Sequence, residues 1–145
     1  MTTAPALPIS TTRTVVADVV PIRASDDVVK VRHAVRARAV EIKLSLVDQT
    51  KIVTAASELA RNVLQYGGGG LMEMEILRDG GRTGLRLTFI DEGPGIPDLE
   101  LALKDGYTTG GGLGLGLSGA RRLSNEFSIE SEVGKGTRIC ITRWK

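Results

Sequence analysis

The alternation of hydrophobic and polar residues along the chain predicts a definite order of strands and helices. Alternating or β-branched runs indicate strands, whereas apolar residues three and four positions apart indicate helices. On this basis we expect strands at 13–20, 71–78, 84–91, 127–133 and 137–143, and helices at 25–43, 48–66, 98–105 and 115–125. This order predicts a two-layer α/β (α+β) sandwich, in which one mixed sheet of about five strands carries about three helices on one face.

Individual residues set the expected ends and buried sides of these elements. Pro21 is expected to close the first strand, and Gly67 to end the second helix. The predicted buried side of the first helix consists of its valines, Val28, Val31, Val35 and Val40. The apolar stripe of the second helix consists of Ile52, Ala55, Ala56, Leu59 and Val63. Glycines at 80–81 and 134–136 predict two hairpin turns.

Length and composition narrow the class of protein. A chain of 145 residues has the size of one domain, so we assign 1–12 to a flexible tail and 13–145 to one domain. Lys and Arg number 19 and Asp and Glu 17, and a net charge of +2 gives no reason to expect a nucleic-acid partner. Apolar runs fall short of the roughly 20 residues of a membrane span, and one cysteine suits a reducing compartment. We therefore expect a soluble, cytoplasmic protein without a membrane or nucleic-acid partner.

Glu58 and Asn62 form the first candidate site. They are four residues apart on the second expected helix. Both side chains therefore point from one face, about 6 Å apart along the helix axis. A carboxylate there can activate a nucleophile, and a carboxamide oxygen can bind Mg²⁺. The alternative is an ordinary solvated helix face, because glutamate is common in helices.

Asp91 is the second candidate. Strand alternation places it on the same face as Leu85, Leu87 and Phe89, at the point where the strand ends. A carboxylate on an apolar face needs a hydrogen-bond donor, which an exocyclic amine such as adenine N6 would supply. The glycines of the following Asp91–Pro97 segment would let a base approach the main chain. The alternative is a turn capped by the aspartate itself.

Two glycine-rich segments are the remaining candidates. Gly110–Leu117 leads into a helix, where free N–H groups and the helix dipole favour a phosphate. A surface loop is the alternative for that segment. Gly134–Thr137 is by itself a hairpin turn, in which the Thr137 hydroxyl could lie beside a ligand.

The order and spacing of these motifs, rather than any one of them, carry a family resemblance. Glu58…Asn62, Asp91-x-Gly-x-Gly, Gly-x-Gly-x-Gly and Gly-x-Gly-Thr resemble the four ATP-binding boxes of the GHKL ATPase and kinase superfamily. The resemblance covers about residues 15–145. It implies the Bergerat fold, ATP and Mg²⁺ as cofactors, and a mobile lid over about 105–113.

The resemblance also implies a role for each matched residue. Glu58 is the catalytic residue that orients or deprotonates the attacking group, and Asn62 binds Mg²⁺. Asp91 binds adenine N6 directly, and Thr137 supports it through water. Five glycines shape the pocket, two around the adenine and three along the phosphates: Gly93, Gly95, Gly112, Gly114 and Gly116.

One branch of the superfamily matches further segments of this chain. Ser57–Asn62, Asp105–Leu117 and Ile141–Trp144 resemble the stressosome switch kinases, which are serine/threonine kinases of bacterial partner-switching modules. The resemblance implies phosphorylation of a STAS-domain protein of a stressosome and binding of a partner phosphatase. His33, the single histidine, lies inside the first expected helix, which does not favour a phospho-accepting histidine.

Two alternatives stay open. One is the sister branch of anti-sigma factor kinases, which also bind a sigma factor; Val63–Tyr66 after the first box favours the switch kinases instead. The other is an ATP-gated binding module without phosphotransfer, against which the position of Glu58 argues. Arg61 and Arg121 are both candidates to face the γ-phosphate.

Overall fold

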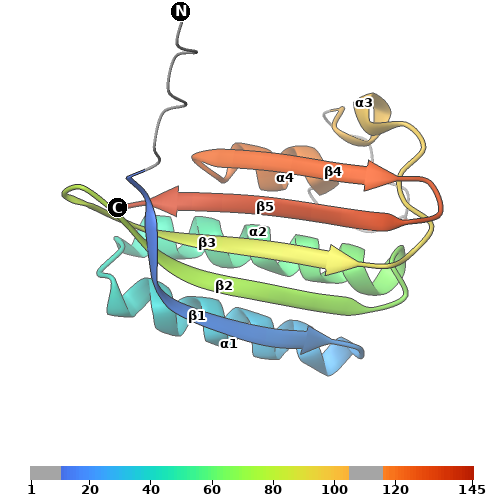
Figure 1. The fold of residues 1–145 in the computed structure, drawn as a ribbon. Coiled ribbons are helices and arrows are strands. Elements are labelled where there is room, and N and C mark those ends of the chain that lie inside the picture. The colour runs from blue at the N-terminus through green and yellow to red at the C-terminus, as the bar shows by residue number, and fades with distance from the viewer. Residues whose placement is uncertain (1–10, 105–115) are drawn as a thin grey trace, which may run out of the picture.

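A computed structural model describes residues 11–104 and 116–145 of the chain. The sheet and the helices form two layers (Figure 1). The elements, in chain order, are β1 (Arg13–Ile22), α1 (Ser25–Glu41), α2 (Leu46–Gln65), β2 (Gly70–Asp79), β3 (Arg82–Asp91), α3 (Leu99–Ala102), α4 (Gly116–Arg122), β4 (Glu126–Glu132) and β5 (Gly136–Trp144). The predicted strands and helices are all present, with shifts at their ends.

The strands form one five-stranded sheet in the order β1-β2-β3-β5-β4. The expectation of a mixed sheet is wrong, because every pair of neighbouring strands is antiparallel. Helices α1 and α2 run out and back, so the chain re-enters the sheet at the end where β1 left it, and β2 runs opposite to β1 (Figure 1). β4 runs in the direction of β3, but β5 lies between them.

Helices α1, α2 and α4 cover one face of the sheet, and the other face is bare of helices (Figure 1). The core lies between the two layers. Its largest fully buried side chains include Phe89, Leu85 and Leu87 of β3, Ile52 and Leu59 of α2, and Val31 and Val35 of α1. The predicted two-layer α/β architecture is confirmed.

Two expectations about β1 and α1 are corrected. The strand continues through Pro21 to Ile22, since β1 is an edge strand and the missing N–H of a proline can face away from the sheet there. Val40 is 54% exposed, whereas Ala39 is fully buried. Residues 28, 31, 35 and 39 follow the helical period, and Val40 is turned by about 100° from that line.

Other element ends also differ from expectation. α2 begins at Leu46 because Ser45 caps it, the Ser45 Oγ accepting from the Asp48 N–H at 3.1 Å. α3 is a single turn from Leu99, capped by Asp98. α4 ends at Arg122 rather than near residue 125, because the chain turns there to pair with β5.

Parts of the predicted tail and the whole predicted lid lie outside the described residues. Of residues 1–12, only Thr11 and Thr12 are described, and both donate to the Asp79 carboxylate. The lid segment, 105–113, is not among the described residues. Over the ranges 11–104 and 116–145, none of the helices is long and apolar enough to cross a membrane.

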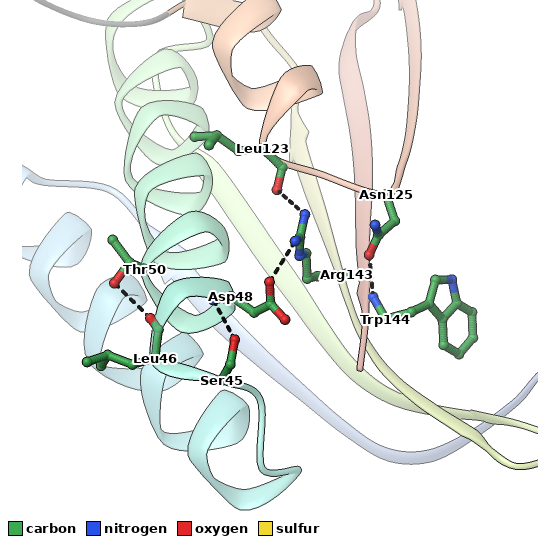
Figure 2. A network of polar contacts seen from close by, with 8 residues as sticks. All are labelled: Ser45, Leu46, Asp48, Thr50, Leu123, Asn125, Arg143 and Trp144. Atoms are coloured by element: carbon green, nitrogen blue, oxygen red, sulfur yellow. Dashed lines mark hydrogen bonds and ion pairs between the residues drawn. The ribbon is translucent and has the colours of Figure 1, made fainter.

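A polar network ties the start of α2 to the end of β5 (Figure 2). Arg143 Nη2 lies 2.6 Å from Asp48 Oδ1, and Arg143 Nη1 donates to the Leu123 carbonyl at 3.3 Å. The adjacent Trp144 N–H donates to Asn125 Oδ1 at 2.7 Å. The Arg143 hydrogen bond holds the pKa of Asp48 below its usual range. These contacts fix α2 and the chain after α4 to the last strand.

Candidate functional site

Two of the predicted site residues, Asp91 and Thr137, lie opposite each other at one end of the sheet. β1, β3 and β4 end there, and β2 and β5 begin there (Figure 1). In register, Gly70 lies opposite Asp91, and Asp91 lies opposite Thr137. The C-terminal end of α2 reaches the same place through Gly67, which lies against the Asp91 side chain. We call this end of the sheet the site end.

Glu58 and Asn62 lie in the second half of α2. The Glu58 side chain is only 14% exposed, and its Oε1 pairs with Arg61 Nη1 at 3.0 Å. The Asn62 side chain is half-buried one turn further on. One face of α2 therefore presents a largely enclosed carboxylate followed by a carboxamide, as the four-residue spacing predicted.

The position of Asp91 at the end of a buried strand face is confirmed. Leu85, Leu87 and Phe89 on the same face of β3 are at most 1% exposed. The Gly93 N–H donates to Asp91 Oδ1 at 2.9 Å. Among the described residues no hydrogen-bond donor pairs with the other carboxylate oxygen, Oδ2.

Glycines surround Asp91 because the backbone approaches it closely from several loops. A Cβ atom on Gly67 would lie 2.4 Å from Asp91 Cγ, and one on Gly136 would lie 2.1 Å from the Asp91 carbonyl oxygen. A Cβ on Gly93 would lie 2.6 Å from Gly67 Cα. Gly95 has a φ of +79° and faces the Glu132 carbonyl oxygen. We name Gly67, Gly93 and Gly136 the glycine hub.

Thr137 belongs to a hydroxyl network. Its Oγ1 lies 2.8 Å from Ser131 Oγ, and the two residues are register partners on β5 and β4. Ser131 Oγ also accepts from the Ile96 N–H at 2.7 Å and donates to the Gly136 carbonyl at 3.2 Å. The network therefore joins the loop after Asp91 to both strands of the last hairpin.

The remaining predicted residues are placed as follows. Gly116 begins α4 with a φ of +65°. Gly112 and Gly114 lie outside the described residues. Of the two cationic candidates, Arg61 pairs with Glu58, and the exposed Arg121 donates weakly to the Leu103 carbonyl at 3.4 Å.

The geometry and the sequence together identify the family. A family model described as "Histidine kinase-, DNA gyrase B-, and HSP90-like ATPase" matches residues 47–145, more than half of the chain. The chain belongs to this ATPase family. The predicted resemblance to the GHKL superfamily is thus confirmed.

Curated relatives include a serine/threonine-protein kinase and an anti-sigma factor. The chain is 46% identical, over 118 residues, to "Serine/threonine-protein kinase RsbT" of Bacillus subtilis (strain 168), a match that covers 81% of this chain and 89% of the relative. It is 30% identical, over 119 residues, to "Anti-sigma F factor" of Geobacillus kaustophilus (strain HTA426), covering 77% and 80%. The expected likeness to the switch kinases and their sister branch is confirmed.

A solved structure supports the fold. "The crystal structure of the RsbU and RsbW domains of Rv1364c from Mycobacterium tuberculosis" matches with a TM-score of 0.62 and 22% identity. The match covers 88% of this chain but only 32% of that one, so the present chain spans about a third of its length. At this identity the likeness concerns the fold alone.

Of the four boxes of the sequence, the structure brings the Asp91 box and the Thr137 box together at the site end. Two residues at the site end were not predicted from the sequence as part of the site. Ser131 has no motif of its own, although the hairpin around 134–136 already set it opposite Thr137. Gly67 was taken as a helix stop, and its contact with Asp91 is a tertiary one that spacing does not reveal.

Proposed function

We propose that this chain is an ATP-dependent serine/threonine-protein kinase of a bacterial partner-switching pathway, acting in the cytoplasm on a STAS-domain protein. One observation carries the proposal. The end of α2, the helix that carries Glu58 and Asn62, contacts Asp91 through Gly67, which supports a site shared by a carboxylate base and a purine-binding carboxylate. The 46% identity to a protein named as a serine/threonine kinase supports the same reaction class.

Each residue then has a chemical role. Asp91 Oδ2 accepts a hydrogen bond from the adenine amine, next to Thr137. Glu58 takes the proton of the acceptor hydroxyl as its oxygen attacks the γ-phosphorus and ADP leaves. One Glu58 oxygen is held by Arg61, which leaves the other for that proton. By the family resemblance Gly112, Gly114 and Gly116 would line the phosphates; of these three, only Gly116 lies among the described residues.

Asn62 is the residue that would hold Mg²⁺. Asn62 is half-buried on α2, and a carboxamide oxygen suits a hard cation. The described residues contain no group of three or more His, Cys, Asp or Glu side chains that could hold a metal by themselves. Mg²⁺ typically binds through one or two protein oxygens together with phosphates and water, and Asn62 fits that set. The ion would neutralise phosphate charge.

Phosphotransfer separates this function from a nucleotide-gated binding protein. We expect wild-type protein to transfer label from [γ-³²P]ATP to a STAS-domain partner. Glu58→Gln should reduce the rate by at least about 10²-fold while ATP affinity, measured by calorimetry, changes only a few-fold. Glu130→Gln is the matched control, because Glu130 is exposed on the helix-free face of β4. Transfer at the wild-type rate in Glu58→Gln would exclude Glu58 as the base.

A second candidate is an anti-sigma factor kinase that binds a sigma factor, favoured by the 30% identity to an anti-sigma F factor. The partner that each kinase retains distinguishes the two. A switch kinase retains a partner phosphatase after its STAS substrate is phosphorylated, whereas an anti-sigma kinase retains a sigma factor. Copurification with purified candidate partners of both classes decides between them.

A further inference from the structure

The proton count of the hydroxyl network at the site end determines the direction of its hydrogen bonds. Ser131 has one hydroxyl proton, and its Oγ makes three contacts: from the Ile96 N–H, to the Gly136 carbonyl and with Thr137 Oγ1. A carbonyl oxygen can only accept, so the Ser131 proton goes to Gly136. All three hydrogen bonds then form together only if Thr137 donates its own proton to Ser131.

Because the Thr137 proton points to Ser131, the Thr137 hydroxyl oxygen can only accept a hydrogen bond on the side that faces Asp91. Asp91 lies opposite Thr137 on β3, and no hydrogen bond joins the two side chains among the described residues. This accords with a Thr137 proton that is directed toward Ser131. Asp91 offers Oδ2, and an ionised carboxylate is acceptor-only. Asp91 and Thr137 therefore present two neighbouring acceptors, and Ser131, which accepts the Thr137 proton, lies next to Thr137 on β4.

We propose that Ser131 is a specificity-determining positioning residue, which holds Thr137 as an acceptor so that the site selects a purine with an amine rather than an oxo group at position 6. The inference rests on the proposed function, because it assumes that Asp91 and Thr137 face the base. An amine donates two hydrogens and suits two acceptors, directly or through water. An oxo group at position 6 is itself an acceptor, so it can form no hydrogen bond with Asp91 or Thr137, and such a purine binds more weakly.

Burial supports a fixed direction. Thr137 is 9% exposed, and Ser131 lies on the half-buried, helix-facing side of β4. Water therefore has little room to replace either hydroxyl as the partner of the other. Removal of the Ser131 hydroxyl frees the Thr137 proton, which can then turn toward the base and donate to an oxo group.

The experiment compares ATP with inosine triphosphate, which carries an oxo group at position 6. Calorimetric affinities for both are measured with Mg²⁺. We expect wild type to prefer ATP and Ser131→Ala to reduce that preference about 3- to 10-fold, as for the reversal of one neutral hydrogen bond. Ser131→Thr, which keeps the hydroxyl, should restore the wild-type preference. Ser128→Ala, on the exposed side of the same strand, should match wild type.

A double variant tests whether Ser131 acts through Thr137. In a Thr137→Val background, Ser131→Ala should leave the ATP-to-inosine triphosphate ratio unchanged. A purely structural role would lower both affinities equally in Ser131→Ala, and that outcome overturns the proposal. An unchanged preference for ATP over inosine triphosphate in Ser131→Ala also overturns the proposal. In either case, if the wild type still binds ATP, the proposed kinase function stands. Failure of wild type to bind ATP would overturn both.

Discussion

At the scale of single residues, the space around Asp91 is the dominant constraint. The glycine hub brings three loops within van der Waals distance of its backbone or side chain. Such close approach is available only where no Cβ atom intervenes. The hub thereby sets where the carboxylate lies, and the Gly93 N–H orients it. A motif that the sequence suggested for ligand approach also has a packing role between loops.

Gly93→Ala tests that packing role. The new Cβ would lie 2.6 Å from Gly67 Cα, a backbone atom that cannot move alone. We expect a loss of about 1–3 kcal/mol in the free energy of unfolding, typical of overpacking. Urea unfolding followed by circular dichroism measures it.

Gly81→Ala is the matched control for Gly93→Ala. Nothing lies within 4 Å of a Cβ at that position, in the β2–β3 turn. Its stability should stay within about 0.5 kcal/mol of wild type. Equal stabilities of the two variants would contradict the close approach of Gly93 and Gly67.

At the scale of elements, the connection between α1 and α2 contains a backbone conformation that does not suit its residue. Lys43, just after α1, has a φ of +61°. The Leu44 N–H donates to the Ala39 carbonyl and the Lys43 N–H to the Val40 carbonyl, as in a helix end closed by a left-handed residue. Glycine is the usual residue there, since a side chain strains this conformation.

Lys43→Gly is therefore expected to stabilise the protein. Relief of the left-handed strain should raise the free energy of unfolding by about 0.5–1 kcal/mol. Thermal and urea unfolding measure the change. Lys51→Gly, inside α2, is the opposite control and should lower stability by about 1 kcal/mol. A loss of stability in Lys43→Gly would mean that the lysine side chain makes a compensating contact.

Local periodicity explains which elements the sequence could predict. The helix period predicts the apolar stripe of α2, and the strand period predicts that Asp91 continues the buried face of Leu85, Leu87 and Phe89. Both predictions are confirmed. Val40 was misplaced because a valine next to the buried line is indistinguishable from one on it without knowledge of the packing. The antiparallel order of the sheet depends on how α1 and α2 return the chain, which hydrophobic pattern alone does not encode.

The candidate site was predictable in its residues but only partly in its contacts. Motif order located Glu58, Asn62, Asp91 and Thr137, and the fold brings their elements to one end. Their roles in binding and catalysis stay predictions. The Ser131 contact depends on the register of a hairpin and on the loop containing Ile96, 35 residues away in sequence. Such tertiary hydrogen bonds leave no spacing signal.

At the scale of the whole molecule, the Asp48–Arg143 pair links segments 95 residues apart. It lies at the opposite end of α2 from Asn62 and holds the helix layer to the last strand (Figure 2). Arg143 is 14% and Asp48 27% exposed at the side chain, so the pair is partly shielded from solvent. Partial burial makes its loss more costly than that of a surface ion pair.

This pair gives the stability of the fold a defined dependence on pH. The pKa of Asp48 is lowered chiefly by its hydrogen bond to Arg143. A lowered carboxyl pKa stabilises the fold above the unfolded value of about 3.9, and that stability is lost as pH falls through the folded value. The free energy of unfolding of wild type should therefore fall more steeply below about pH 4 than that of Asp48→Asn. The two curves should converge in acid.

Urea unfolding across the acid range measures both curves. Arg143→Met removes the other partner and should show the same flattened acid dependence as Asp48→Asn. The double variant should add nothing further to it, because one interaction accounts for both changes. If the free energy of unfolding of Asp48→Asn falls with pH as steeply as that of wild type, other carboxylates cause the acid unfolding.

The antiparallel sheet brings the end of α2, the end of β3 and the last hairpin together, although they lie far apart along the chain. A molecule bound across these three segments acts as a removable cross-link that closes long loops of the unfolded chain. Ligand occupancy is then coupled to the integrity of the entire fold rather than to one local loop. Release of the ligand loosens the same three junctions together, so resistance to protease along the chain should follow the nucleotide concentration.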